Sequence, residues 1–269
     1  MHSSQLQAEL PPPAPDALAH SARLQERIRA EIQAHGGSIS FERYMELALY
    51  APGLGYYSAG ARKFGAAGDF ITAPELSPLF ARCLAVQCAA LLQVLGGGDI
   101  LELGAGSGAM AADMLAELET RGTLPEHYWI LEVSAELRDR QRLTLAKRAP
   151  VLLKHVHWLE RLPETFTGVM LGNEVLDALP VVRFRRAAQG FEEYCVAHRD
   201  GELAWQLRPA SAGLQSALTV LEADLPQPLA AGYSSEICPR LPPLIASLAD
   251  TLTRGALLFT DYGYARAVY

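Results

Sequence analysis

A glycine-rich segment after a short apolar run is the strongest chemical signal in the sequence. It reads Ile100-Leu101-Glu102-Leu103-Gly104-Ala105-Gly106-Ser107-Gly108, and an amphipathic stretch begins directly after it. Glycines allow positive φ angles and close approach of the backbone to a ligand, and the start of a helix offers N–H donors that have no partner within the helix. A strand–loop–helix junction of this composition therefore predicts a nucleotide-containing cofactor.

Two classes of cofactor fit this loop. Gly104-x-Gly106-x-x-Ala109 agrees loosely with the dinucleotide fingerprint, which makes NAD the first rival. Glu102 argues against it, because a carboxylate near the loop suits the ammonium and sulfonium of S-adenosylmethionine better than a pyrophosphate. Gly108, the third glycine at a spacing of two, also favours S-adenosylmethionine.

A second acidic residue supports a nucleoside site without choosing between these cofactors. Glu132 ends the next predicted strand, where its carboxylate can accept hydrogen bonds from both ribose hydroxyls. Both cofactor classes use such an acid, so Glu132 is predicted to bind the ribose in either case.

The candidate catalytic residues follow the fourth predicted strand, in Asn173-Glu174-Val175-Leu176-Asp177-Ala178-Leu179-Pro180. Asn173 offers a carbonyl that can orient an attacking nitrogen. Glu174 and Asp177 are three residues apart and share a face if a helical turn begins here. An ordinary first turn of a helix is a competing interpretation for Asp177.

The elements that must position these residues follow from the apolar pattern. Helices are expected from Leu18 to the Gly36-Gly37 stop and at 41–50, 78–95, 109–121, 135–148, 214–225 and 241–252. Short apolar strands at 99–103, 128–133, 154–158, 168–172 and 256–260 alternate with helices, which predicts an α/β fold with a doubly wound, mostly parallel sheet. Strands at 181–186, 191–197 and 202–207, with an Asp200-Gly201 hairpin turn, predict an antiparallel excursion.

Composition narrows the classes of partner. The chain has 269 residues, of which 50% are apolar, and a net charge of −7, which argues against nucleic acid. The cysteines lack zinc-like spacing, so we expect free thiols and no metal site. No stretch of about 18 apolar residues was found that would span a membrane. Residues 1–17 are expected to be a disordered leader without signal-peptide character, which predicts a cytoplasmic protein.

Four segments together give the sequence a family resemblance. They are Tyr44-Met45-x-Leu47-Ala48-Leu49-Tyr50-x-Pro52-x-x-Gly55-Tyr56-Tyr57, Gly68-Asp69-Phe70-Ile71-Thr72-Ala73-Pro74-Glu75-Leu76-Ser77, Glu102-Leu103-Gly104-x-Gly106-x-Gly108, and Asn173-Glu174-x-x-Asp177-Ala178-Leu179-Pro180. The sequence resembles the MidA-like family of S-adenosylmethionine-dependent methyltransferases, formerly a domain of unknown function, from about Ile39 to Tyr264. The mitochondrial members of that family are arginine methyltransferases that act on a subunit of respiratory complex I and are needed for its assembly.

The resemblance implies a class I methyltransferase core, which is Rossmann-like. Gly104, Gly106 and Gly108 would line the methionine part of the cofactor and Glu132 the ribose, and Gly68, Asp69 and Thr72 would lie near the cofactor or its lid. We expect an N-terminal helical or lid segment at 18–98 and a core at 99–269 with an insertion at about 181–253. The class I sheet has two further strands after the fifth, so we expect C-terminal strands to be missing from this chain.

The favoured function is therefore S-adenosylmethionine-dependent methylation of a protein arginine, with a respiratory-chain subunit as the implied substrate. Carboxylates can hold a guanidinium bidentately, so Glu174, with Asp177 or Glu236, is the candidate for this role, while Asn173 orients the nitrogen. A cofactor-binding assembly chaperone with little turnover is the alternative, and an NAD-dependent oxidoreductase is less favoured. The excursion at 181–207 offers a contact surface for an oligomer.

Overall fold

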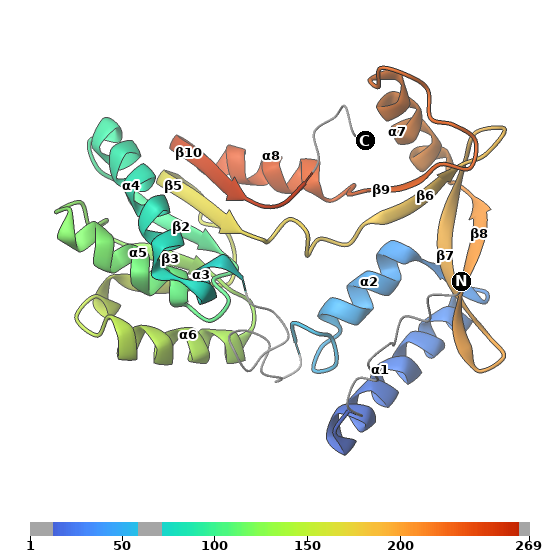
Figure 1. The fold of residues 1–269 in the computed structure, drawn as a ribbon, viewed down its shortest axis with the longest axis horizontal. Coiled ribbons are helices and arrows are strands. Elements are labelled where there is room, and N and C mark those ends of the chain that lie inside the picture. The colour runs from blue at the N-terminus through green and yellow to red at the C-terminus, as the bar shows by residue number, and fades with distance from the viewer. Residues whose placement is uncertain (1–12, 59–71, 264–269) are drawn as a thin grey trace, which may run out of the picture.

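The computed structural model describes residues 13–58 and 72–263, and two β-sheets divide them into two halves (Figure 1). One sheet is parallel and the other is antiparallel, and each has five strands. Two connections that lie wholly within the described residues, at 174–181 and 238–240, run between the halves.

The parallel sheet lies in one half and has the strand order β10-β5-β2-β3-β4. Apolar side chains of its central strands alternate between two buried clusters: Ile100 and Val169 belong to one, and Leu101 and Met170 to the other. Burial on both faces explains why these strands are short, nearly continuous apolar runs. The strands are β2 (Asp99–Leu103), β3 (Tyr128–Leu131), β4 (Val156–Leu159), β5 (Phe166–Asn173) and β10 (Leu252–Thr260).

Helices cover both faces of this sheet. On one face pack α4 (Pro78–Leu95), α5 (Ala109–Thr120) and α6 (Ala135–Arg148), and on the other α8 (Leu241–Thr251). The short α3 (Ala73–Leu76) precedes α4, and a 3₁₀ turn, Leu153–His155, precedes β4. By length and composition alone, α4 is apolar enough to cross a membrane, but its buried face packs against α5 in the core.

The antiparallel sheet builds the other half. Its strands are β1 (Ser38–Ser40), β6 (Val182–Arg186), β7 (Phe191–Arg199), β8 (Glu202–Pro209) and β9 (Ser234–Ile237), in the order β1-β7-β6-β9, with β8 also paired to β7. The β7–β8 turn has positive φ at both Asp200 and Gly201, as a two-residue hairpin requires. On one face α1 (Pro15–Ala34) and α2 (Phe41–Tyr50) pack around Val196, and α7 (Ala212–Ala223) covers Phe184 on the opposite face.

The predicted fold class is confirmed, because the parallel sheet and the antiparallel strands are both present. The predicted helices and core strands agree with the observed ones to within a few residues. The structure adds β1, β9 and α3, which were not predicted. The predicted segment at 18–98 contributes to both halves, since α1 and α2 pack on the antiparallel sheet and α4 on the parallel one.

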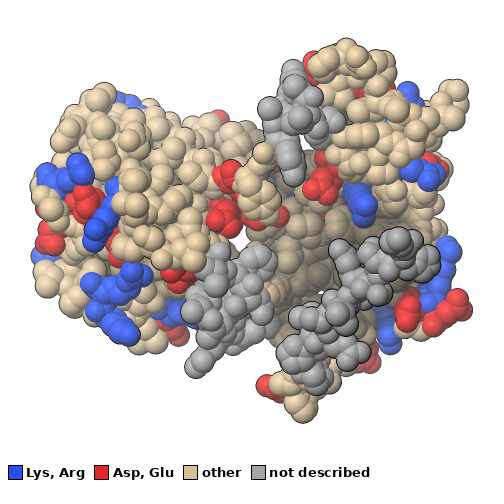
Figure 2. All heavy atoms as spheres, viewed as in Figure 1, with Lys and Arg blue, Asp and Glu red and all other residues tan. Residues whose placement is uncertain are grey.

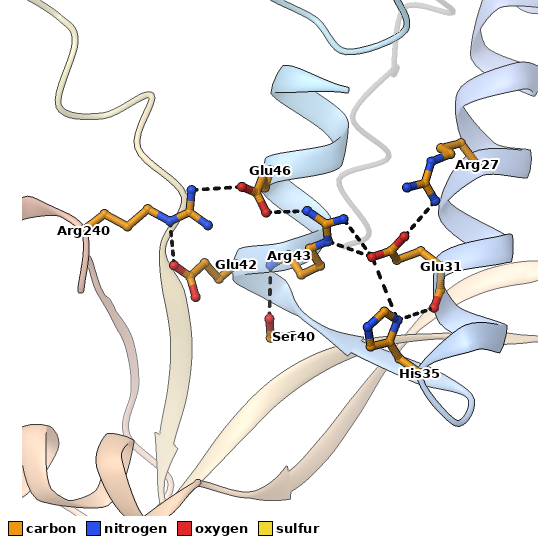
Figure 3. Close-up of polar contacts among 8 residues, drawn as sticks. All are labelled: Arg27, Glu31, His35, Ser40, Glu42, Arg43, Glu46 and Arg240. Atoms are coloured by element: carbon orange, nitrogen blue, oxygen red, sulfur yellow. Dashed lines mark hydrogen bonds and ion pairs between the residues drawn. The ribbon is translucent and has the colours of Figure 1, made fainter. Parts of the chain in front are cut away.

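An ion-pair network fixes α2 against its neighbours (Figure 3). Arg240, in the connection before α8, donates to Glu42 (2.8 Å) and Glu46 (3.2 Å) on α2. Arg43 on α2 donates to Glu46 at 2.6 Å and to Glu31 on α1 at 2.9 Å. The network joins α1, α2 and the connection at 238–240. It therefore constrains the orientation of α2 and the position of its C-terminal residue, Tyr50.

Tight packing between strands predicts a specific sensitivity at Gly255 in β10. Its φ is +145°, and a Cβ there would overlap the carbonyl oxygen of Gly168 on β5. We expect Gly255→Ala to lower the free energy of unfolding by at least about 3 kcal/mol, measured by urea denaturation. Gly213→Ala in α7 is the matched control, because a Cβ there meets nothing within 4 Å. It should change stability by less than about 1 kcal/mol, and equal losses in both variants would contradict the packing argument.

Candidate active site

A cavity of about 540 Å³ opens at the carboxyl ends of β2, β3 and β5. Its floor is the loop at 103–107, one end is the segment at 132–137 after β3, and the other is the segment at 173–175 after β5. Tyr50 and Tyr57, from the antiparallel half, line it as well. The volume lies within the roughly 300–1,000 Å³ typical of small-molecule sites.

The glycine loop follows β2 with a backbone that only glycine adopts easily. Gly104, Gly106 and Gly108 have φ angles of +62°, +53° and +83°. Gly104 also approaches Val175 so closely that a Cβ would lie 3.1 Å from its Cγ1. Gly108 does not line the cavity: it precedes α5, and a Cβ there would lie 3.0 Å from the Cα of Gln141. Gly104 therefore leaves no room for a side chain beside Val175 in the cavity wall, and Gly108 lets the start of α5 pack closely on α6.

A hydroxyl in the loop ties it to α3. Ser107 donates a short hydrogen bond to the carboxylate of Glu75 and accepts one from the Ala109 N–H at 3.2 Å. Glu75 and Thr72 also line the cavity, and Thr72 precedes α3 as its N-cap residue. The segment that resembles the family motif therefore reaches the cavity at Thr72, while Gly68 and Asp69 lie outside the described residues.

Glu102 is a buried carboxyl beneath the loop, with only 1% of its surface exposed. The hydroxyl of Tyr128 donates to its Oε2 at 2.7 Å. Burial raises the pKa of Glu102 to about 7, and the Tyr128 hydrogen bond opposes that shift. Because Glu102 also lines the cavity, its carboxyl is placed to pair with a cationic group of a ligand.

Glu132 lines the end of the cavity that follows β3, opposite Asn173 and Glu174, and two neighbours hold its carboxylate. The Ser134 N–H donates to its Oε1 at 2.9 Å, and the side-chain amide of Gln141 donates to its Oε2 at 3.2 Å. Burial raises the pKa of Glu132, and these hydrogen bonds lower it. Its carboxylate can accept further hydrogen bonds from the cavity, as two ribose hydroxyls would provide.

Gln141, which sequence reasoning missed, organises this end of the site. It is fully buried on α6, and its amide also donates to the Gly106 carbonyl at 3.2 Å. Its carbonyl accepts from the indole N–H of Trp158 at 2.8 Å. Leu137, Gln141 and Leu145 are spaced four residues apart and are all buried. The sequence signal for Gln141 was therefore a polar residue in line with the apolar residues on the buried face of the helix.

Asn173 and Glu174 line the cavity at the end of β5. Glu174 has a φ of +49°, a costly conformation for a residue other than glycine, and its N–H donates to the Thr260 carbonyl at 2.9 Å. The Asn173 carbonyl accepts from the Thr260 hydroxyl at 3.0 Å, and its amide faces Glu174 Oε1 at 3.5 Å.

The helical turn considered for the segment after Glu174 does not form. The backbone bends there, and the carboxylate of Asp261 accepts from the N–H groups of Leu176 (3.1 Å) and Asp177 (3.4 Å). Asp177 is exposed, accepts a hydrogen bond from the Tyr262 hydroxyl at 2.7 Å and does not line the cavity. Glu236 lies on β9, also outside the cavity lining.

The residues present fit S-adenosylmethionine. Glu132 is placed for the ribose, the glycine loop for the centre of the ligand, and the buried carboxyl of Glu102 for a cation. In the sheet β2 lies between β3 and β5, so a nucleoside at Glu132 directs the opposite end of the ligand toward Asn173 and Glu174. The cavity thus accommodates a nucleoside at one end and a reacting group at the other.

Comparisons with known proteins agree with this arrangement. A family of S-adenosyl-L-methionine-dependent methyltransferases matches residues 83–269. The chain is 30% identical to the "Protein arginine methyltransferase NDUFAF7, mitochondrial" of Danio rerio over 85% of its own length and 59% of that protein's. It is also 30% identical to the protein of the same name from Homo sapiens, and that match covers 85% of this chain and 56% of the human protein.

A solved structure is more similar still. The crystal structure of a "COG1565 superfamily member and likely methyl transferase" from Burkholderia thailandensis, bound to S-adenosyl-homocysteine, has 45% sequence identity to this chain and a TM-score of 0.88. The match covers 95% of this chain and 66% of that one. The chain thus spans a little over half the length of the two curated relatives and about two thirds of this structure. The prediction of S-adenosylmethionine as the cofactor is confirmed.

Removing the Gln141 amide should weaken cofactor binding. Gln141→Leu leaves the Gly106 carbonyl, the Glu132 carboxylate and the Trp158 N–H without their buried partner. Unsatisfied buried groups cost about 1–3 kcal/mol, so we expect the affinity for S-adenosyl-homocysteine to fall at least about tenfold by calorimetry. Thr144→Ala, on the same helix but outside the cavity lining, is the control. Unchanged affinity in the leucine variant would exclude an organising role for Gln141.

Burial of Glu102 makes stability without cofactor depend on pH. The group titrates near 4.5 in the unfolded chain and near 7 in the folded one, so between these values the folded chain holds the extra proton. The contribution of Glu102 to the free energy of unfolding therefore falls as pH rises from about 5 to about 7, by up to the order of 3 kcal/mol. We expect Glu102→Gln to remove this fall when urea denaturation is compared at pH 5, 6, 7 and 8. Parallel pH profiles for the two proteins would contradict the assignment.

Proposed function

The chain belongs to a family of S-adenosyl-L-methionine-dependent methyltransferases, and we propose that it transfers the methyl group to a guanidinium nitrogen of an arginine in a protein. The observation that carries this proposal is a single cavity that joins the cofactor loop to the carboxylate of Glu174. The names of the mitochondrial relatives support arginine as the acceptor.

S-adenosylmethionine supplies a methyl carbon that its sulfonium already activates. The chain therefore has to align the acceptor nitrogen and exclude water, which accounts for a large share of the rate in such reactions. Cavity residues around the β5 end provide the alignment, because the order β5-β2-β3 separates the ribose site from Glu174 by the width of the glycine loop. The apolar lining by Leu103, Val175 and Met110 limits water around the reacting groups.

Glu174 is the residue proposed to hold the acceptor. Its strained backbone is held by the hydrogen bond to Thr260 on β10, and its carboxylate can accept N–H groups from a guanidinium. Such pairing would localise the positive charge away from the attacking nitrogen. Asn173, whose carbonyl already accepts from Thr260, has a second lone pair with which to orient that nitrogen.

The resemblance found from the sequence implies a subunit of respiratory complex I, and we propose a protein substrate of this kind with the cytoplasm as the location. The net charge of −7 favours a basic segment of the partner over nucleic acid.

A labelled transfer assay tests the proposal. The purified protein is incubated with S-adenosylmethionine carrying a labelled methyl group and an extract of cells that lack the protein. We expect one or a few labelled protein bands, with methylarginine identified by mass spectrometry. Labelled lipid, nucleic acid or small molecules would exclude a protein acceptor, and absence of any label would favour the chaperone alternative.

Glu174→Gln separates transfer from binding. It keeps the shape of the side chain and removes the charge that would hold the guanidinium, so we expect transfer to fall about 10²-fold with S-adenosyl-homocysteine affinity within twofold. Glu236→Gln on β9 serves as the matched variant and should leave transfer unchanged. A fall with Glu236→Gln and none with Glu174→Gln would assign the role to Glu236 instead.

A further inference from the structure

The acceptor side of the cavity is walled by two tyrosines that the parallel sheet does not supply. Tyr50 ends α2 and Tyr57 lies in the turn after it, and both line the cavity together with Glu174. Their rings stack with centroids 5.5 Å apart and an interplanar angle of 27°. A third ring, Tyr56, lies nearly perpendicular to Tyr57, with the ring centroids 5.2 Å apart and an interplanar angle of 85°. An aromatic wall therefore lies beside the carboxylate proposed to hold the acceptor.

Hydrogen bonds fix this wall in place. The Tyr50 hydroxyl donates to the carbonyl of Ala178 at 2.7 Å, across to the segment that follows Glu174. The N–H of Tyr57 donates to the Leu49 carbonyl at 2.7 Å, which folds the turn back on α2. The turn has no room for a side chain at Gly55, where a Cβ would overlap the backbone of Tyr50 and Ala51. The two rings are thus held against each other before any ligand binds.

The charge around the wall is negative. Burial raises the pKa of Tyr57, and the carboxylates of Asp177 and Glu174 raise it further, so the phenol stays neutral. Burial also raises the pKa of Tyr50. Tyr57 and Asp177 raise it further, and the positive charge of Arg240 opposes the shift. Figure 2 shows acidic side chains gathered where the two halves of the molecule meet. Neutral aromatic faces beside carboxylates attract a cation.

We propose that the Tyr50–Tyr57 pair is the acceptor-specificity element of this enzyme. It receives the planar guanidinium of arginine against an aromatic face while Glu174 accepts its N–H groups. A guanidinium is planar and weakly hydrated and stacks on aromatic rings, whereas a lysine ammonium is compact and strongly hydrated. The pair therefore selects arginine over lysine and over uncharged isosteres, and this inference rests on the proposed function.

Binding of small acceptor mimics to the protein loaded with S-adenosyl-homocysteine tests the inference. The probes are arginine amide, lysine amide and the uncharged citrulline amide, followed by NMR titration. For the unchanged protein we expect arginine amide to bind more tightly than both others. Tyr57→Leu should weaken arginine amide about fivefold to thirtyfold, the equivalent of about 1–2 kcal/mol of cation–π interaction, and should leave citrulline amide within twofold. Tyr57→Phe keeps the aromatic face and should stay within about twofold for arginine amide.

The outcomes separate the inference from the proposed function. Equal binding of arginine amide to Tyr57→Leu and the unchanged protein would overturn the aromatic role, and so would equal binding of arginine and citrulline amides. Labelled methylarginine in the transfer assay would still uphold the proposed function in either case. If Tyr57→Leu also loses affinity for S-adenosyl-homocysteine, Tyr57→Phe decides, because a tenfold loss of arginine amide in the phenylalanine variant would contradict the inference.

Discussion

Parallel pairing of three strands sets the positions of Gly104, Glu132 and Asn173 in the cavity. Leu103 lies opposite both Leu131 and Gly172, so β2, β3 and β5 end at one level. The next residue of each strand is Gly104, Glu132 or Asn173, and all three open on the same cavity. Helices cover both faces of the sheet, and the loops beyond its carboxyl edge are where a ligand can enter such an architecture.

Buried polar side chains turn that edge into a site with fixed chemistry. Glu132 and Glu102 are both buried, and burying a carboxyl is costly unless hydrogen bonds compensate. Gln141 and Ser134 satisfy part of Glu132, and Tyr128 satisfies part of Glu102. Both carboxyl groups also line the cavity. A ligand that brings ribose hydroxyls and an ammonium completes these interactions, which links the affinity for the cofactor to groups the fold has already desolvated.

The sequence allowed this half to be predicted because its signals are local. The glycine loop, the strand before it and the helix after it are contiguous, and Glu132 ends the next strand. The strands β1 and β9 were missed because three or four residues rich in serine carry no usable alternation, and they form only where β7 and β6 offer backbone partners. The helical turn considered after Glu174 does not form, again because of a distant partner. The N–H groups of Leu176 and Asp177 donate to the carboxylate of Asp261, which lies 84 residues from Asp177, and no local sequence pattern encodes that contact.

The end of the cavity lined by Tyr50 and Tyr57 depends on contacts between residues that are even further apart in the sequence. Tyr50 reaches Ala178 over 128 residues, and Arg240 reaches Glu42 over 198. Exposed ion pairs contribute roughly 0–1 kcal/mol each, so the buried cluster of Ile28, Ile32 and Leu47 supplies most of the stability of α2 while the ion pairs fix its orientation. The glycine loop at 103–107 lies in the other half and makes none of these contacts. The end of the cavity beside Glu174 is shaped by how α2 of the antiparallel half is held against the segment after β5, and contacts over such separations leave no local pattern in the sequence, whereas the cofactor loop is a run of adjacent residues.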